Sequence, residues 1–171
     1  NDKHNRRRQT PDSKLESGTM KTKTLLAAAV LLATGYAATA GAATLTNSQA
    51  NHVIEDAEST SKAQNSTGCA VVVDNDGMLL SFQRLDGATP GCIDAAIGKA
   101  RTSALYHAPS VKFMQRLQSG ETTVLAIPHA VPLGGGYPLT LQGEVVGAVG
   151  VSTPKQDLDN QASETAAKSL K

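Results

Sequence analysis

The histidines of this sequence are the side chains best suited to bind a metal. Three follow residue 43: His52, His107 and His129. Each imidazole can ligate a metal ion or a haem iron, and each can titrate near neutral pH. Their spacing matches no metal-binding motif such as His-Glu-x-x-His. All three are therefore candidate ligands, and the alternative for each is a surface or hydrogen-bonded structural histidine.

A second group of candidates falls on one predicted helix. Lys99, Arg101 and Thr102 lie close together there, and Lys99 and Thr102 share a helix face because they are three residues apart. Such a group can bind a carboxylate, for example a haem propionate. The alternative, which the pattern alone favours, is a solvated helix face without a ligand.

Three consecutive glycines, Gly134, Gly135 and Gly136, form the third candidate. Without side chains, their backbone N–H groups can approach an anion or a flat ligand. The segment is neither a P-loop nor a dinucleotide-binding motif. The pattern alone favours the other interpretation, a loop that crosses tightly over another element.

The two cysteines, Cys69 and Cys92, can form a disulfide. The bond would close a loop of about 23 residues and stabilise the fold by roughly 3 kcal/mol. Two buried free thiols fit the spacing equally well. A metal-binding pair is the weakest alternative because no Cys-x-x-Cys is present.

Four helices are expected to position these residues. The first covers about residues 46–64 and begins with a capping box between Thr46 and Gln49. The second covers residues 93–105, and a shorter third helix covers residues 110–118. A second capping box, from Thr153 to Gln156 with proline at the first helical position, predicts the start of the last helix.

Strands are predicted between these helices. Residues 69–73 and 78–84 form a hairpin around the turn Asn75-Asp76-Gly77, and residues 137–141 and 145–151 form a second hairpin. Residues 124–127 are a short strand or an extended segment. The order predicts an α+β fold, a mainly antiparallel sheet flanked by helices.

The amino-terminal part has the pattern of an export signal. Residues 20–42 combine a lysine-containing start, an apolar run and the small residues Ala40-Gly41-Ala42. The apolar run has about 9 residues, whereas a membrane span needs about 20, so we expect a cleaved signal peptide and no stable membrane span. We also expect residues 1–19 to be upstream or added sequence and residues 43–171 to form one domain that is periplasmic or secreted.

The expected mature domain is mildly acidic. It has nine lysines and arginines against twelve aspartates and glutamates, a net charge of about −3. Because no basic face remains to attract phosphates, nucleic-acid binding is not expected.

Five segments, in order, together resemble the GlcG/HbpS-type haem-binding family. They are VDNDGMLLSFQRLDGA at 73–88, IDAAIGKARTSA at 93–104, PLGGGYPL at 132–139, GEVVGAVGVS at 143–152 and PKQD at 154–157. The resemblance covers nearly all of residues 43–171. It implies a profilin-like sandwich that often forms homo-oligomers, with haem bound by some members and degraded or used in redox sensing by others.

The resemblance also indicates which residues contact a ligand. Lys99 and Thr102 fall on its Lys-Ala-Arg-Thr motif, and Gly135 and Gly136 on its Gly-Gly motif. His52 lies on the first helix, a region that supplies a haem ligand in some relatives, so it is the candidate metal ligand. The leading hypothesis is an exported protein that binds haem or another small ligand. The alternatives are an oxidative haem-degrading enzyme and an oligomeric sensory or assembly module without catalysis.

Overall fold

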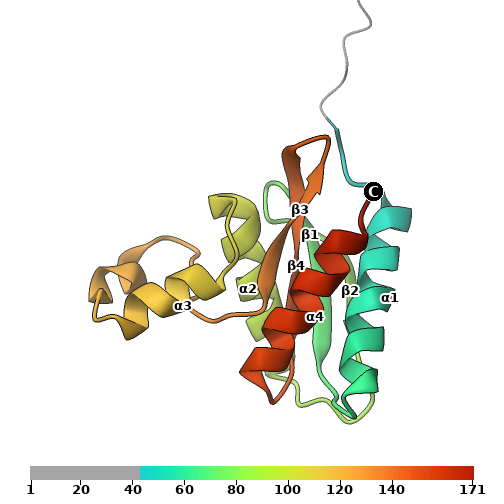
Figure 1. Cartoon of the computed structure of the whole chain (residues 1–171), viewed down its shortest axis with the longest axis horizontal. Coiled ribbons are helices and arrows are strands. Elements are labelled where there is room, and N and C mark those ends of the chain that lie inside the picture. The colour runs from blue at the N-terminus through green and yellow to red at the C-terminus, as the bar shows by residue number, and fades with distance from the viewer. Residues whose placement is uncertain (1–42) are drawn as a thin grey trace, which may run out of the picture. The chain divides into compact units, whose positions relative to one another are not determined.

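The computed structural model describes residues 43–171 (Figure 1). The predicted signal peptide at 20–42 and the upstream segment at 1–19 lie outside the described residues. Within 43–171, no helix combines the length and the apolar character needed to cross a membrane.

The first helix, α1 (Asn47–Ala63), begins at the predicted capping box. The Thr46 hydroxyl accepts a hydrogen bond from the Gln49 backbone N–H at 3.2 Å, and the Gln49 side chain accepts one from the Thr46 N–H at 3.0 Å. These two bonds satisfy donors that a helix start leaves free. The prediction for this terminus is confirmed.

The four strands form one antiparallel sheet in the order β2-β1-β4-β3. They are β1 (Cys69–Asp74), β2 (Leu79–Arg84), β3 (Gly136–Leu141) and β4 (Glu144–Ser152). Both predicted hairpins are present, and β1 also pairs with β4, which joins the two hairpins into one sheet. Gly77 has φ +77° in the first turn, a conformation that glycine adopts without a Cβ clash.

Helices cover both faces of this sheet. Helix α1 and the last helix, α4 (Gln156–Ser169), pack together on one face, where α1 contributes Val53 and Ile54 and β1 contributes Val72. Helix α2 (Cys92–Tyr106) covers the other face with its alanines, against Val71 and Val73. This arrangement confirms the predicted α+β sheet flanked by helices (Figure 1).

A short helical excursion connects α2 to β3. It contains α3 (Val111–Gln118) and the 3₁₀ helix η1 (Thr122–Ala126), and it packs on α2 through Tyr106 and Phe113, whose ring centroids are 5.3 Å apart. The prediction of a strand or extended segment at 124–127 is wrong. Val124 is fully buried but the next residue, Leu125, is 62 % exposed, so this apolar run inserts one side chain into the fold and pairs with no strand.

The predicted capping box at 153–156 is also wrong. Helix α4 has Lys155 as its N-cap, and the Lys155 side chain makes no capping hydrogen bond. The Thr153 hydroxyl accepts a hydrogen bond from the Lys155 N–H at 3.1 Å, while the Gln156 side chain donates to the Gly134 carbonyl at 2.7 Å. Tertiary contacts with the glycine segment therefore replace the local capping pattern.

Candidate functional site

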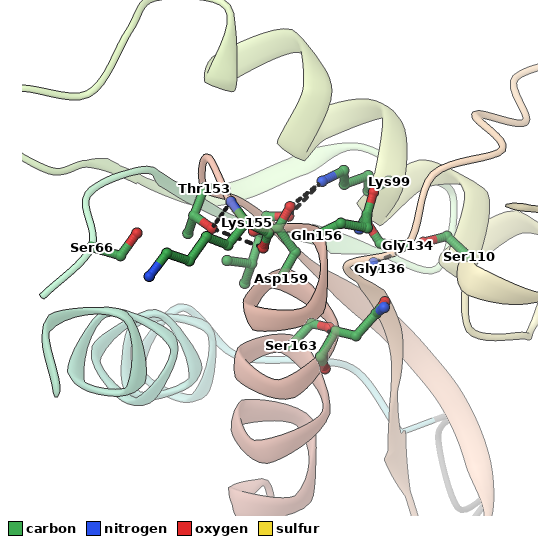
Figure 2. A network of polar contacts seen from close by, with 12 residues as sticks. Ser66, Lys99, Ser110, Gly134, Gly136, Thr153, Lys155, Gln156, Asp159 and Ser163 are labelled. Atoms are coloured by element: carbon green, nitrogen blue, oxygen red, sulfur yellow. Dashed lines mark hydrogen bonds and ion pairs between the residues drawn. The ribbon is translucent and has the colours of Figure 1, made fainter. Parts of the chain in front are cut away.

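A buried ion pair links the predicted lysine helix to the last helix. Lys99 extends from α2 towards α4, where its Nζ lies 2.6 Å from Oδ2 of Asp159, and both side chains are only 3 % exposed. Figure 2 shows this pair among the polar contacts that surround the start of α4. The pair thus connects helices that cover opposite faces of the sheet.

Neighbouring backbone groups complete the hydrogen bonding of this pair. Lys99 Nζ also donates to the Val151 carbonyl at 3.1 Å, and Oδ1 of Asp159 accepts from the Thr153 N–H at 2.6 Å. Burial raises the pKa of Asp159 above its ordinary value, although the nearby Lys99 ammonium and the Thr153 N–H act in the opposite direction. Burial therefore disfavours the charge on Asp159, whereas Lys99 and the Thr153 N–H favour it.

The glycine segment packs directly against this ion pair. A Cβ on Gly135 would lie 2.7 Å from Asp159 Cβ and 3.3 Å from Lys99 Cδ, and one on Gly136 would overlap the Lys99 carbonyl oxygen. The Gly136 N–H donates to the Ser110 hydroxyl at 2.8 Å, and the Ser110 N–H donates to the Gly136 carbonyl at 3.0 Å. Side-chain and backbone atoms of Lys99 and Asp159 fill the space beside these glycines. This is the tight crossing over another element that the pattern favoured.

The other polar residues of α2 also make internal contacts. Thr102 is fully buried; its hydroxyl donates to the Gly98 carbonyl and accepts from the Val131 N–H, both at 2.8 Å. Arg101 Nε donates to the Gly77 carbonyl at 3.0 Å and so ties the first hairpin to α2. The helix face that carries Lys99 and Thr102 is therefore buried, whereas their spacing favoured a solvated face.

The three histidines lie apart in the chain on different elements, and all are exposed. His52 is on α1, His107 ends α2 with φ +50°, and His129 lies in the loop after η1 with φ +58°. Within residues 43–171, no three histidine, cysteine, aspartate or glutamate side chains are grouped so that they could hold a metal ion.

Of the three histidines, His52 lines a cleft. This His52 cleft, of about 340 Å³, lies between the start of α1 and the end of α4 and is lined by Ser48, Gln49, His52, Ser169, Leu170 and Lys171. The His52 ring lies beside two carboxylates, with Nε2 3.6 Å from Asp56 Oδ2 and Nδ1 3.9 Å from Glu55 Oε2. An imidazole, an apolar side chain and a lysine in one cleft suit the iron, the ring and a propionate of haem, respectively.

Cys69 and Cys92 are joined by a disulfide with a Cα–Cα distance of 5.4 Å. The bond links the first residue of β1 to the first residue of α2 and lies beside a second cleft, of about 430 Å³. We call this the disulfide cleft. None of the three histidines and none of Gly134, Gly135 and Gly136 lines it.

Asp159 is the residue of this site that the motifs did not reveal. It lies three and four residues before Ala162 and Ser163, which are both buried, so it belongs to the inward face of α4. An acidic residue on the apolar face of a helix needs an internal cation. That position, together with a lysine on another predicted helix, is the sequence signal for the pair.

Comparison with known proteins finds a family model and relatives that match most of residues 43–171. A family model described as "Haem degrading protein HbpS-like" matches residues 45–168. Protein GlcG of Escherichia coli strain K12 is 30 % identical over 108 residues, which cover 63 % of this chain and 81 % of GlcG.

Solved structures agree with this result. A crystal structure of a double mutant of HbpS from Streptomyces reticuli is 31 % identical, covers 84 % of this chain and 99 % of that one, and superposes with a TM-score of 0.70. A structure described as a complex of PduOC with haem is 20 % identical, covers 75 % of this chain and 96 % of that one, and has a TM-score of 0.68. At that identity, the second likeness shows a shared fold.

Proposed function

This chain belongs to the HbpS-like family, and from that premise we propose that it is an exported protein that binds haem. The family model is that of a haem-degrading protein, and the likeness to HbpS extends over 99 % of the HbpS chain. Family membership supports haem as the ligand. The binding site is inferred separately, from the residues of this chain.

The observation that carries the proposal is the His52 cleft. The His52 side chain is 60 % exposed, so an iron can approach it without rearrangement of the helix. Haem supplies an iron that accepts an axial nitrogen ligand. If one ring nitrogen of His52 bound the iron, the other would remain near Asp56 or Glu55, and a carboxylate in that position would orient the imidazole.

The same cleft supplies the remaining contacts. Leu170 offers apolar surface to the porphyrin, and the Lys171 ammonium can pair with a propionate. Lys99 is not retained for this role, because its ammonium is 3 % exposed and already bound to Asp159. A propionate would have to displace an internal carboxylate to reach it.

A haemin titration of the purified protein tests this proposal. We expect a saturable shift of the Soret band, and we expect His52→Ala to weaken haemin binding by about tenfold or more through the loss of the axial ligand. His107→Ala and His129→Ala are matched controls that remove exposed histidines outside this cleft. A titration without saturation, or a loss of affinity confined to one of the control variants, contradicts the proposal.

Export is supported by two separate features. Residues 20–42 have the order of a signal peptide, and the Cys69–Cys92 disulfide is a bond that persists in oxidising compartments. Mass spectrometry of the protein from an expressing bacterium should find a chain that begins near Ala43. A chain that retains residues 20–42 contradicts cleavage.

The description of the family favours a second function, oxidative breakdown of haem. This activity would require access of oxygen or peroxide to the bound iron, and the His52 cleft is open to solvent on the exposed side of His52. Loss of the Soret band under reductant or peroxide should then be faster than for free haemin. Equal rates would leave binding alone as the function.

Self-association is the third part of the proposal. Strand β2 lies at the edge of the sheet, where Leu79 and Phe82 are 53 % and 37 % exposed and Met78 in the adjoining turn is 59 % exposed. Apolar side chains along an edge strand favour pairing between subunits. We expect light scattering to detect a homo-oligomer at micromolar concentration, and a monomer there contradicts this part.

A further inference from the structure

The disulfide cleft has Cys92, one half of the disulfide, in its wall, and it has no role in the haem proposal. Its wall includes Thr67, Ala88, Thr89, Gly91, Cys92 and Ser152, and none of the residues that line it has a charged side chain. The Thr67 hydroxyl donates to the Asp86 carbonyl at 2.8 Å and so fixes the loop that forms one side. A cleft of about 430 Å³ with hydroxyl and apolar walls is large enough for a small organic molecule.

The two sulfur atoms differ in their access to this cleft. Cys92 lines the cleft, and it is 7 % exposed. Cys69 does not line it, is 2 % exposed, and packs with Val71 and Val73 in the core beneath α2. A molecule in the cleft can therefore approach the sulfur of Cys92 more easily than that of Cys69.

Cys92 also has the more favourable position for a thiolate. It is the first residue of α2, and Gly91 at the N-cap has no side chain to cap the helix. A helix N-terminus stabilises a nearby negative charge, whereas an apolar core disfavours one. Access from the cleft and the place of Cys92 at the helix start therefore favour Cys92 over Cys69 as the attacking thiol once the disulfide is reduced.

We propose that the disulfide cleft is a site of thiol–disulfide exchange with a small thiol or its disulfide, in which Cys92 forms the mixed disulfide and Cys69 resolves it. In the oxidising direction, the Cys92 thiolate attacks one sulfur of the small disulfide, and the other sulfur leaves as a thiolate. Cys69 then loses its proton to solvent and attacks Cys92 Sγ, and the second small thiolate leaves. The protein loses two electrons, and one small disulfide is reduced to two thiols.

The reducing direction follows the same path. A small thiolate attacks Cys92 Sγ, the Cys69–Cys92 bond breaks, and the Cys69 thiolate takes a proton from water. A second small thiolate then attacks the small-molecule sulfur of the mixed disulfide. The two small thiols leave as one small disulfide, and Cys92 is released as a thiolate. Because the bond joins β1 to α2 at the cleft, the small thiol controls a covalent tie between the sheet and the helix.

The test uses the full chain, reduced and then exposed to glutathione disulfide as the probe. Intact-mass spectrometry follows the addition of one glutathione to Cys69→Ser, which keeps Cys92, and to Cys92→Ser, which keeps Cys69. We expect Cys69→Ser to react at least about tenfold faster, because access and thiolate character set the rate. In urea, where the fold no longer distinguishes the thiols, we expect the two rates to converge.

A second variant tests the cleft itself. A Cβ on Gly91 meets nothing within 4 Å, and its φ of −62° is ordinary for any residue, so Gly91→Leu adds bulk at the cleft without backbone strain. In the Cys69→Ser background, it should slow the reaction by about tenfold by blocking access. Ser119→Leu, at an exposed position after α3, is the matched control and should leave the rate unchanged.

Two results overturn the proposal. One is a rate for Cys92→Ser that equals or exceeds the rate for Cys69→Ser in the folded protein. The other concerns the wild-type chain, reduced and then quenched early in the reaction: its glutathione is found on the peptide that contains Cys69. This measurement does not depend on how well the variants fold. Neither result depends on haem, so failure here is distinct from failure of haem binding.

Discussion

Lys99 of α2 and Asp159 of α4 form an ion pair whose two side chains are each 3 % exposed, with Gly135 packed against both. The pair connects the two helical layers around the end of the sheet. It also accounts for the lysine motif and the glycine motif together, because the glycines leave the room that the lysine needs.

Removal of either partner should destabilise the protein strongly. Lys99→Ala or Asp159→Ala leaves a buried charge without its partner, so we expect the free energy of unfolding to fall by about 3–5 kcal/mol in urea denaturation. The double variant Lys99→Met with Asp159→Leu should be closer to wild type, because no unpaired charge remains. Lys168→Ala, which breaks an exposed pair with Glu164, is the control and should leave the free energy of unfolding nearly unchanged.

Stability should depend on pH through Asp159. Its pKa is raised in the folded protein, mainly by burial, so the fold binds a proton at pH values where the unfolded chain has lost it. This contribution to stability is fully present below about pH 4, the pKa of an unfolded aspartate, and is lost as the pH rises through the folded pKa.

The comparison with Asp159→Asn isolates this effect. The unfolding free energy of wild type minus that of the variant should decrease as the pH rises from about 3 towards the folded pKa, with other carboxyl groups cancelling. A difference that increases with pH would mean that Lys99 lowers the folded pKa of Asp159 more than burial raises it.

Replacement of Gly136 by alanine should disrupt the contact between β3 and α2. The new Cβ would overlap the Lys99 carbonyl oxygen, which belongs to helix backbone and cannot turn aside, so we expect a loss of about 3 kcal/mol or more in thermal or urea unfolding. Gly91→Ala is the matched control: its Cβ meets open space, and the change should stay within about 1 kcal/mol. Similar losses in both variants would argue against a steric cause.

The N-cap residues of α1 and α4 should respond differently to mutation. Thr46→Ala removes the capping box of α1 and should cost about 1 kcal/mol of unfolding free energy. Lys155→Ala replaces the N-cap residue of α4, whose side chain makes no capping bond, and should change stability by less than about 0.5 kcal/mol. A larger cost for Lys155→Ala would mean that this side chain stabilises the start of α4 through another contact.

Local patterns predicted the fold well because most elements are determined locally. The Asn75-Asp76-Gly77 turn requires a glycine with positive φ, and Thr46 with Gln49 forms a cap from residues three apart. Residues 124–127 were different. A short apolar run is compatible with several structures, and only the burial of Val124 within the fold selects the 3₁₀ helix.

The candidate site was harder to predict because its contacts span long distances in sequence. The Lys99 partner is 60 residues away, and the Gln156 side chain bonds to a carbonyl 22 residues before it. Spacing along one helix indicated correctly that Lys99 and Thr102 share a face, but it could not show that this face is buried. Similarly, the sequence left the state of Cys69 and Cys92 open because a bond depends on the distance between β1 and α2.

Gly136 and Gly150 are paired across β3 and β4, and both lie directly beneath the backbone of α2, under the carbonyls of Lys99 and Ala96. A contact made by main chain on main chain has no side chain that can change rotamer to absorb a displacement. A displacement of α2 should therefore displace β3 and β4 with it, so we expect the helix and the sheet to move as one rigid unit.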